Sequence, residues 1–328
     1  MNAPLVSICV PIYGVEKYIE RCARSLFGQT YQNIQYVFVN DCTKDASIDI
    51  LQNVLNDYPN RLNQVKIVHH KKNLGLGGAR NSAIENVQGD FLMWVDSDDY
   101  IDLECVSKLV GKLVVTDADI VACDVFYDYE THKEISQQRL SNNPKQECLD
   151  ICSCRAKHMV WGRLIRTSLY RDNHISVRLG CDMGEDRQVV PKLYYFAKKT
   201  AVLKEPLYYY FNGNVSAYSA SFSTKKAEQW LLSTDIVTDF FKDKPEEYRV
   251  ALEKGSAIML AELMMGCVRC ANKDAYAKIR MRMNEISEIS VKAVPVSYKV
   301  LYYLKCWWML VLYAKIGHWI KQIKMKLV

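Results

Sequence analysis

Three carboxylates lie close together in the segment Asp96-Ser97-Asp98-Asp99, directly after the apolar run of residues 91–95. Carboxylates this close repel one another and favour protonation unless a cation lies among them. Magnesium and manganese ions bind hard oxygen ligands, often one or two carboxylates together with the phosphates of a substrate. The segment therefore predicts a divalent metal site that receives a phosphorylated substrate. The alternative is an acidic turn that caps the helix expected from about Leu103.

Asp41 occupies the equivalent position after residues 36–40, which have the composition of another buried strand. A carboxylate there is well placed to accept hydrogen bonds from a nucleobase or a ribose. A purely structural turn is an equally good interpretation of the residue alone. Asp45, a few residues further on, is expected to cap the next helix.

A glycine-rich segment, residues 71–81, lies between the third expected strand and the following helix. Its glycines let the backbone approach a ligand closely, and Arg80 carries several donors suited to phosphate or base edges. The segment begins a G-x-G at Gly75 and Gly77, but Arg80 stands where a dinucleotide-binding fingerprint has its third glycine. It also does not follow the first strand, which argues against an NAD-dependent dehydrogenase.

The pair Glu185-Asp186 precedes an apolar stretch with helical spacing, residues 188–196. Acidic residues at a helix N-terminus interact favourably with the helix dipole, so the pair on its own is typical of a helix start. His69 and His70 end a strand, and no catalytic role is predicted for them.

The elements that must position these residues alternate along the first half of the chain. β-branched and aromatic content predicts buried strands at residues 5–12, 36–40, 65–69, 91–95 and 120–126. Apolar residues at helical spacing predict helices at residues 15–29, 46–58, 78–87 and 103–115. Such alternation predicts a mostly parallel sheet with helices on both faces, in which ligands bind at the carboxyl ends of the strands.

Four motifs together resemble a known family. They are Val6-Ser7-Ile8-Cys9-Val10-Pro11-Ile12-Tyr13, Asn40-Asp41, Gly78-Ala79-Arg80-Asn81 and Asp96-Ser97-Asp98-Asp99. In this order and spacing they resemble the inverting glycosyltransferases of family 2, which have the GT-A fold. The resemblance covers about residues 4–215. It departs at Asp41-Cys42-Thr43, where the family usually has a D-D/N-G-S turn, and this departure bears on which base is bound.

The resemblance implies a site for a nucleotide-sugar donor, with UDP as the expected nucleotide, and a divalent metal, Mn²⁺ or Mg²⁺. The implied metal ligands are Asp98 and Asp96. The implied catalytic base is Asp186, with Glu185 as the alternate. The residues implied at the donor are Pro11, Tyr13, Val15, Asp41, Gly78, Arg80, Asp96, Ser97 and Trp161.

The implied reaction transfers a hexosyl or N-acetylhexosaminyl group, with inversion, to a glycan or lipid-linked acceptor in bacterial surface-polysaccharide synthesis. Trp161 lies in Trp161-Gly162-Arg163, which resembles the Trp-Gly-Lys segment of the family, and a buried core tryptophan is an equal alternative. The tyrosines Tyr208-Tyr209-Tyr210 are expected in a strand rather than at a sugar.

The predicted organisation has two parts. Residues 1–222 form the GT-A catalytic domain, with residues 1–126 as its nucleotide-binding half and 127–222 as its acceptor half. Residues 223–328 form a C-terminal helical region that ends in a basic, aromatic-rich tail. A polar stretch at residues 137–146 is expected to be a surface loop.

Positive charge is concentrated in the tail. The net charge is +6, and the segment after Glu288 holds no acidic residue and seven lysines: Lys292, Lys299, Lys305, Lys315, Lys321, Lys324 and Lys326. Because the main body is nearly neutral, nucleic-acid binding is not expected. Residues 297–328 are instead expected to bind an anionic membrane surface, with packing into the protein or into a homodimer interface as the alternative.

The twelve cysteines are scattered through apolar runs, as buried reduced thiols are, and no secretion signal opens the chain. We therefore expect a cytoplasmic protein, peripheral at the inner face of the cell membrane. Two other functions remain open, a sugar nucleotidyltransferase and a catalytically silent nucleotide-sugar-binding protein. Glu185-Asp186 favours glycosyl transfer over the former, and the intact acidic motifs argue against the latter.

Overall fold

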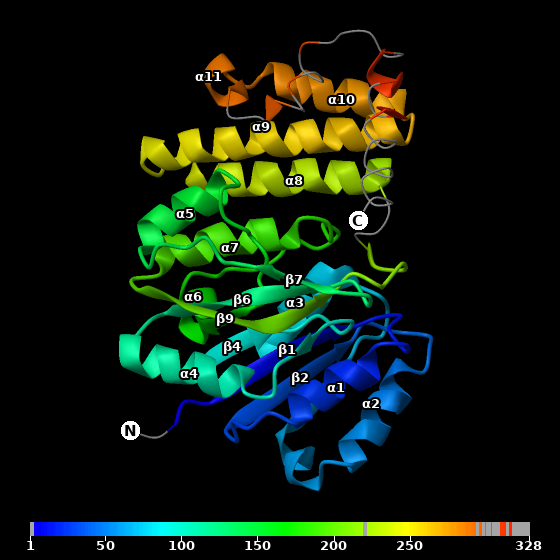
Figure 1. Ribbon diagram of the computed structural model, residues 1–328, viewed down its shortest axis with the longest axis vertical. Helices are drawn as coiled ribbons and strands as arrows, with labels where there is room; N and C mark the ends of the chain where they lie inside the picture. Colours follow the sequence, from blue (N-terminus) through cyan, green and yellow to red (C-terminus); the bar gives the residue numbers. More distant parts are fainter. Residues whose placement is uncertain are drawn as a thin grey trace. The chain divides into compact units, whose positions relative to one another are not determined.

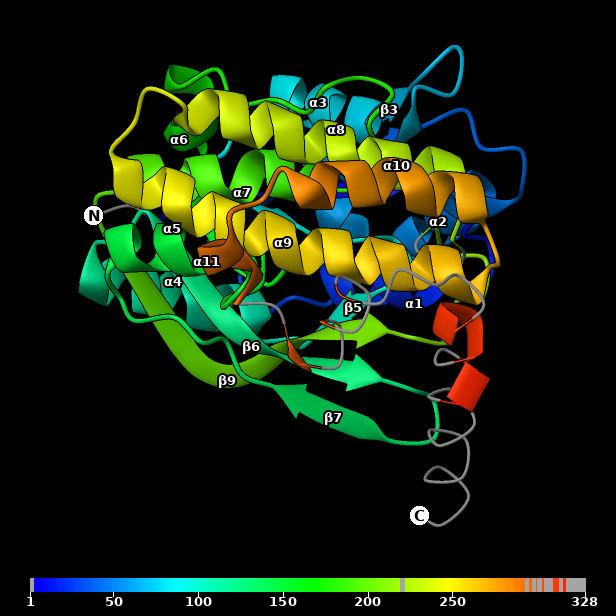
Figure 2. The ribbon, with the colours of Figure 1, turned by 90° about the horizontal axis from the view of Figure 1, so that it is seen from above.

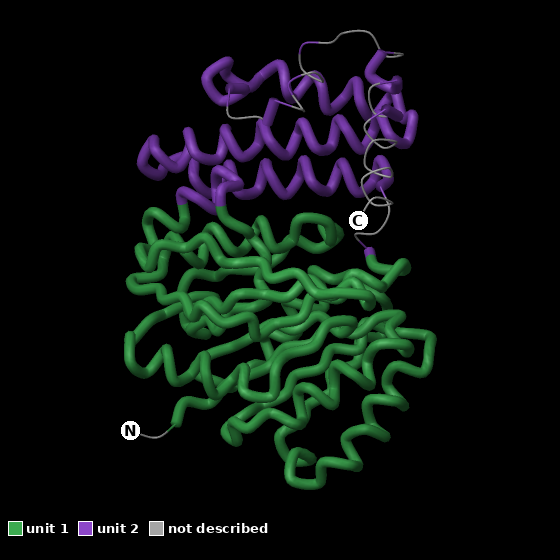
Figure 3. Tube along the Cα trace, viewed as in Figure 1, with its two compact units in different colours: residues 1–148, 156–217 green, residues 149–155, 218–328 purple. Residues whose placement is uncertain are grey.

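A computed structural model describes residues 3–218, 222–292, 295–296, 299, 303, 309–312 and 315–316. The chain divides into two compact units (Figure 3). The first comprises Met1–Cys148 and Ala156–Ala217, and the second comprises Leu149–Arg155 and Tyr218–Val328. Residues 149–155, from the middle of the chain, thus belong to the C-terminal unit. A single boundary at residue 222 places them in the N-terminal part instead.

The first unit begins with strands and helices in alternation. The elements are β1 (Val6–Ile12), α1 (Ile19–Phe27), β2 (Ile34–Asn40), α2 (Ser47–Asn56), the short 3₁₀ helix η1 (Pro59–Gln64), β3 (Val65–His69), α3 (Gly75–Asn86) and β4 (Phe91–Trp94). β1 pairs in parallel with both β2 and β4, and β2 pairs in parallel with β3. Because parallel strands end at the same edge, the residues that follow these four strands lie at one edge of the sheet.

The second half of this unit adds antiparallel strands. It contains β5 (Tyr100–Ile101), α4 (Cys105–Thr116), β6 (Ile120–Asp128), β7 (Lys133–Ser136), the start of α5 (Pro144–Cys152), β8 (Arg163–Arg166), α6 (Thr167–Asp172), α7 (Glu185–Phe196) and β9 (Thr200–Phe211). The end of α5, from Leu149, belongs to the second unit. The strand order is β3-β2-β1-β4-β8-β6-β9-β5, with β7 paired to β6. β8 lies antiparallel between β4 and β6, so the sheet is mixed beyond β4.

Helices cover both faces of this sheet, as the sequence predicts (Figures 1 and 2). Alternate residues of β1, from Val6 to Ile12, are buried in one apolar cluster with residues of α1, α2 and α4. Cys9 is also fully buried but lies outside that cluster, on the side of the strand that faces α3. Since both faces are covered, β1 is buried along its whole length, which explains its continuous apolar sequence.

Residues 137–146 were expected to form a surface loop, but their last three residues belong to a helix. α5 begins at Pro144, and proline is favoured in the first helical turn because its missing N–H would have no partner there. The tyrosines 208–210 lie within β9, which confirms their expected place in a strand.

The second unit contains α8 (Thr224–Phe241), α9 (Glu246–Arg269), α10 (Lys273–Asn284) and α11 (Glu288–Val291). Met264, Met265 and Ile279 form its apolar cluster with Leu310, and Val311 packs against it. Most of the tail, residues 297–328, lies outside the described residues, including Trp307, Trp308 and Trp319. Among the helices that the structure describes, none is long and apolar enough to cross a membrane.

Candidate active site

The acidic segment after β4 contains one structural carboxylate. Asp99 is 1% exposed, its Oδ2 accepts a hydrogen bond from the Tyr208 hydroxyl at 2.6 Å, and its Oδ1 accepts one from the backbone N–H of Phe211 at 2.8 Å. Burial, and then the charges of Asp98 and Asp96, raise the pKa of Asp99 well above its usual range. Asp99 therefore ties the end of β4 to β9.

Asp96 and Asp98 are the more accessible carboxylates of this segment. Asp98 Oδ2 accepts a hydrogen bond from the Asn214 side-chain amide at 2.8 Å, and Asp96 Oδ1 lies 3.3 Å from Arg80 Nη2. Burial and the charge of Asp96 raise the pKa of Asp98. Ser97 between them is buried. Two carboxylates that repel each other across one residue suit a divalent cation, which offsets the repulsion.

No group of three or more His, Cys, Asp or Glu side chains converges on one point in the described part of the chain. A cation held by Asp96 and Asp98 would therefore take its other ligands from water or from a substrate, as Mg²⁺ commonly does.

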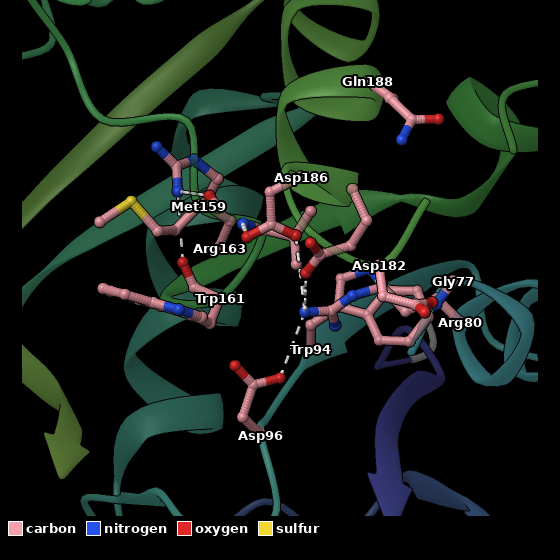
Figure 4. A network of polar contacts seen from close by, with 12 residues as sticks. Gly77, Arg80, Trp94, Asp96, Met159, Trp161, Arg163, Asp182, Asp186 and Gln188 are labelled. Carbon is pink, nitrogen blue, oxygen red and sulfur yellow. Dashed lines mark hydrogen bonds and ion pairs between the residues drawn. The ribbon is translucent and has the colours of Figure 1, made fainter. Parts of the chain in front are cut away.

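Arg80 connects this segment to the predicted base (Figure 4). Its Nη2 lies 3.3 Å from Asp96 Oδ1, 3.3 Å from Glu185 Oε1 and 3.5 Å from Asp186 Oδ1. The guanidinium carbon lies 5.1 Å from the centre of the Trp94 ring, and Arg80 is only 2% exposed. Its Nε and Nη1 find no hydrogen-bond acceptor among the described residues. The side chain thus joins carboxylates that are about 90 residues apart in the sequence.

Glu185 and Asp186 form the first turn of α7, after Gly184, whose φ of 79° is a left-handed conformation that suits glycine. Burial raises the pKa of Asp186, against the opposing effect of Arg80 and of a hydrogen bond from Val160 N to Asp186 Oδ2 at 3.1 Å. Burial, and then the charge of Asp186, raise the pKa of Glu185.

Asp186 Oδ1 accepts no hydrogen bond from the described residues. A buried carboxylate with one oxygen free of hydrogen bonds and a raised pKa is suited to accept a proton from a substrate hydroxyl.

Trp161 lies within the core of the first unit. It is 3% exposed and stacks on the rings of Tyr208 and Tyr210, with centroids 5.0 and 5.4 Å apart. Through Tyr208 it supports Asp99 rather than offering an exposed face.

Asp41 is 3% exposed and accepts several hydrogen bonds. Its Oδ1 accepts from Leu74 N at 2.7 Å and contacts His70 Nδ1 at 2.7 Å, while its Oδ2 accepts from Gly75 N at 2.9 Å. His70 Nε2 in turn lies 2.8 Å from Ser82 Oγ. No role was predicted for His70. In the parallel register of β2 and β3, Asn40 pairs with His69. The next residues along the two strands, Asp41 and His70, therefore lie side by side, and this pairing is the signal for their contact.

The residues after β1 differ in exposure. Tyr13 is 56% exposed, whereas Val15 is 7% exposed and its backbone N–H donates to Ser47 Oγ at 3.1 Å. Pro11 is buried within β1, in register with Val39. Of these three residues, Tyr13 is the one whose side chain is open to a ligand.

The glycines at the start of α3 serve packing. A Cβ at Gly78 would lie 2.5 Å from Leu74 Cβ, and one at Gly75 would lie 2.3 Å from Asp182 Oδ1. Asp182 Oδ1 also accepts a hydrogen bond from Gly77 N at 3.1 Å. Asp182, which was not predicted, therefore holds the loop before α7 against the N-terminus of α3 (Figure 4).

An arginine thus joins an acidic segment at the carboxyl edge of the parallel half-sheet, where ligands bind in such sheets, to a buried pair of carboxylates. The model of the family described as Glycosyl transferase family 2 matches residues 7–189. The chain belongs to this family. Membership favours glycosyl transfer over the nucleotidyltransferase and the silent binding protein.

Similar proteins support this assignment. The chain is 30% identical over 262 residues to "Putative glycosyltransferase EpsH" of Bacillus subtilis (strain 168), covering 77% of this chain and 74% of EpsH. It is 27% identical over 211 residues to poly(ribitol-phosphate) beta-N-acetylglucosaminyltransferase TarS of Staphylococcus aureus, covering 62% of this chain but only 35% of TarS.

Solved structures show the same fold. The structure of S. aureus TarS 1–349 in complex with UDP-GlcNAc matches with a TM-score of 0.69 at 21% identity, over 97% of this chain and 92% of that chain. The mannosyltransferase PcManGT of Pyrobaculum calidifontis, in complex with GDP-Man and Mn²⁺, matches with a TM-score of 0.56 at 13% identity, over 96% and 87%. The predicted fold class, a GT-A sheet followed by C-terminal helices, is thereby confirmed.

Proposed function

We propose that this family 2 enzyme transfers a hexosyl or N-acetylhexosaminyl group from a UDP-sugar, with inversion, to a hydroxyl of a glycan or lipid-linked acceptor. One observation carries the proposal: Asp186 Oδ1 accepts no hydrogen bond from the described residues, yet lies 3.5 Å from an arginine that also contacts Asp96. The proposed proton acceptor, Asp186, is thus separated only by the Arg80 side chain from Asp96, in the acidic segment where the phosphates of the donor would bind.

The proposed division of labour follows from this arrangement. Asp186 accepts the proton of the acceptor hydroxyl as its oxygen attacks the anomeric carbon from the side opposite the leaving nucleotide. The positive charge of Arg80 lowers the pKa of Asp186 and of Glu185 against the larger effect of burial, and so favours their ionised forms. Glu185 is the alternate base, since it lies at the same guanidinium.

Asp96 and Asp98 are the residues that would hold a divalent cation, Mn²⁺ or Mg²⁺. Their fit rests on the raised pKa of Asp98, to which the charge of Asp96 contributes and which a bound cation would reverse. When bound, the ion stabilises negative charge on the leaving diphosphate. The Mn²⁺ in the complex of the similar mannosyltransferase supports the same metal class.

The proposed donor and the proposed role in polysaccharide synthesis are supported by similar proteins as well as by residues of this chain. Exposed Tyr13 and buried Asp41 lie after neighbouring strands, where a base and ribose would bind. The UDP-GlcNAc complex of TarS, and the poly(ribitol-phosphate) that names its activity, support a UDP-sugar and a role in surface-polysaccharide synthesis.

Product analysis tests the proposal. The full chain, incubated with a panel of UDP-sugars and Mn²⁺ or Mg²⁺, should release UDP, and excess chelator should stop the release. Release of pyrophosphate from a sugar phosphate and UTP would instead indicate the nucleotidyltransferase. No turnover with any donor, despite donor binding, would indicate the silent protein.

A further inference from the structure

Lys157 is half-buried and lies three residues before Val160, whose backbone N–H donates to Asp186. Lys157 Nζ donates to the Tyr127 hydroxyl at 2.6 Å and to Ser136 Oγ at 2.7 Å, and it lies 4.3 Å from the centre of the Tyr127 ring. Both partners are neutral. No carboxylate among the described residues forms an ion pair with Lys157, so its positive charge is not offset by an acidic neighbour.

The charged groups around Lys157 are also positive. Burial first, and then the charges of Arg139 and Arg163, lower the pKa of Lys157. Arg163 is fully buried and donates to the carbonyls of Met159, Trp161 and Lys157 and to the Tyr194 hydroxyl, all of them neutral.

The same positive field acts on the next residue. His158 has a pKa lowered to about 3, chiefly by burial and further by Arg187 and Arg163. Cations gathered in a partly dry region repel one another, and an anion bound among them would reverse that cost.

The position of this cluster relative to the catalytic groups indicates which substrate it faces. Val160, three residues after Lys157, donates its N–H to Asp186. On the other side, the Tyr127 ring packs edge-on against Tyr210, with centroids 5.4 Å apart, and Tyr210 stacks on Trp161. Trp161 in turn stacks on Tyr208, which bonds to Asp99. Lys157 thus lies at the far end of an aromatic stack from the acidic segment, and three residues before the backbone N–H that donates to Asp186.

We propose that Lys157 and Arg139 bind a phosphate group of the acceptor, so that the enzyme acts on a hydroxyl of a phosphorylated glycan, alditol or lipid. The inference rests on the proposed function, because it takes Asp186 as the group that the acceptor hydroxyl approaches. Lysine binds phosphate as a point charge with rotatable donors, and the exposed Arg139 adds a planar set of donors. Arg163 adds positive charge near Lys157 and is not itself a ligand of the phosphate in this proposal.

Titration calorimetry tests the site directly. The full chain is saturated with UDP and Mg²⁺, so that the donor's phosphate site is filled, and is titrated with inorganic phosphate, glycerol 3-phosphate, farnesyl diphosphate and glucuronate. We expect the three phosphates to bind. Tighter binding of glycerol 3-phosphate indicates an alditol phosphate as source, and tighter binding of farnesyl diphosphate indicates a lipid. Glucuronate binding as tight as phosphate would overturn the choice of phosphate.

Lys157→Gln and Arg139→Gln should each weaken phosphate binding about tenfold, as expected for loss of a charge-assisted contact. Lys133→Gln is the matched control, because Lys133 is an exposed lysine of β7, the strand that carries Ser136, and its Nζ lies over the Tyr209 ring, 4.8 Å from the ring centre. Arg139 is exposed, so its variant reports binding even where Lys157→Gln impairs folding.

The site is refuted if wild type binds no phosphate, if Arg139→Gln and a folded Lys157→Gln both bind it as wild type does, or if Lys133→Gln loses as much affinity. Phosphate binding is measured without sugar transfer. Failure of UDP release therefore counts against the proposed function, and failure of phosphate binding counts against this inference.

Discussion

The Nη2 atom of Arg80 lies 3.5 Å from the Oδ1 atom of Asp186, and both residues are almost completely buried. Burial and, to a lesser extent, the charge of Asp96 raise the pKa of Asp186, while Arg80 acts in the opposite direction. The same guanidinium contacts Asp96, so the base and the acidic segment share one cation. A change of charge at Asp96 therefore alters the pKa of Asp186.

We predict that Arg80→Met moves the acid limb of kcat/KM to higher pH. Asp186 must be deprotonated to act, so activity is lost as pH falls through its pKa. Removing Arg80 removes the effect that opposes burial, and the pKa of Asp186 rises further. A pH profile at saturating metal measures the shift, and activity should recover toward alkaline pH. A uniform loss at every pH would show that Arg80 acts only on structure.

Asp186→Asn should leave donor affinity within a few-fold of wild type and lower transfer by roughly two to four orders of magnitude, the range for loss of a general base. Asparagine preserves the side-chain shape and can still accept from Val160 N through its amide oxygen. Glu185→Gln is the matched variant. If Glu185→Gln shows this kinetic profile and Asp186→Asn does not, then Glu185 is the base.

Asp98→Ala should abolish transfer and the metal dependence of donor binding, because Asp96 alone cannot hold a cation against a diphosphate as two carboxylates do. Titration of a UDP-sugar with and without Mn²⁺ measures the difference. Glu104→Gln is the control, since Glu104 is a nearby carboxylate whose side chain is 60% exposed. Full wild-type activity in excess chelator would contradict the prediction.

His70→Ala should weaken donor binding about tenfold with little change in kcat, because it removes a hydrogen-bond partner of the buried carboxylate of Asp41. His70 acts here as a positioning residue, through Asp41. Ser82→Ala, which removes the next partner in the chain, should have a smaller effect. Competition by UDP against other nucleoside diphosphates provides the specific readout: a structural role alone would weaken all of them equally.

The strands that carry the site were predictable because their apolar runs are continuous and flanked by polar residues. β3 has the predicted bounds, Val65–His69, and β1 differs by one residue. The four-residue strand β8 was not predictable as the antiparallel partner of β4. Its place depends on pairing with strands about 40 and 70 residues away in the sequence, which local composition does not encode.

The candidate site shows the same limit. Asp96, Asp98, Glu185 and Asp186 were predicted from their types and from the resemblance, but the role of Arg80 as the common contact of Asp96, Glu185 and Asp186 depends on tertiary structure. Likewise α3 begins at Gly75 rather than Gly78, because Asp182, more than a hundred residues away, accepts a hydrogen bond from Gly77 at its first turn.

The remaining prediction concerns the tail, which we propose binds an anionic membrane surface and keeps a cytoplasmic enzyme at the inner face of the cell membrane. Seven lysines follow Glu288 without an acidic residue. Leu310 is buried in the helical cluster of the second unit, so deleting the tail would also remove a packing contact. Charge variants avoid this problem, and Lys321→Gln, Lys324→Gln and Lys326→Gln are combined for that reason.

Each lysine near anionic lipid contributes on the order of 1 kcal/mol, so the triple variant should bind phosphatidylglycerol vesicles at least tenfold more weakly at low salt. The matched control replaces three exposed lysines of the first unit, Lys198, Lys199 and Lys204, with glutamine. Sedimentation of the full chain with vesicles measures both. Because the attraction is electrostatic, wild type should leave the pellet as salt rises. If wild type stays in the supernatant, or if both triple variants lose binding equally, then the tail does not direct the enzyme to the membrane.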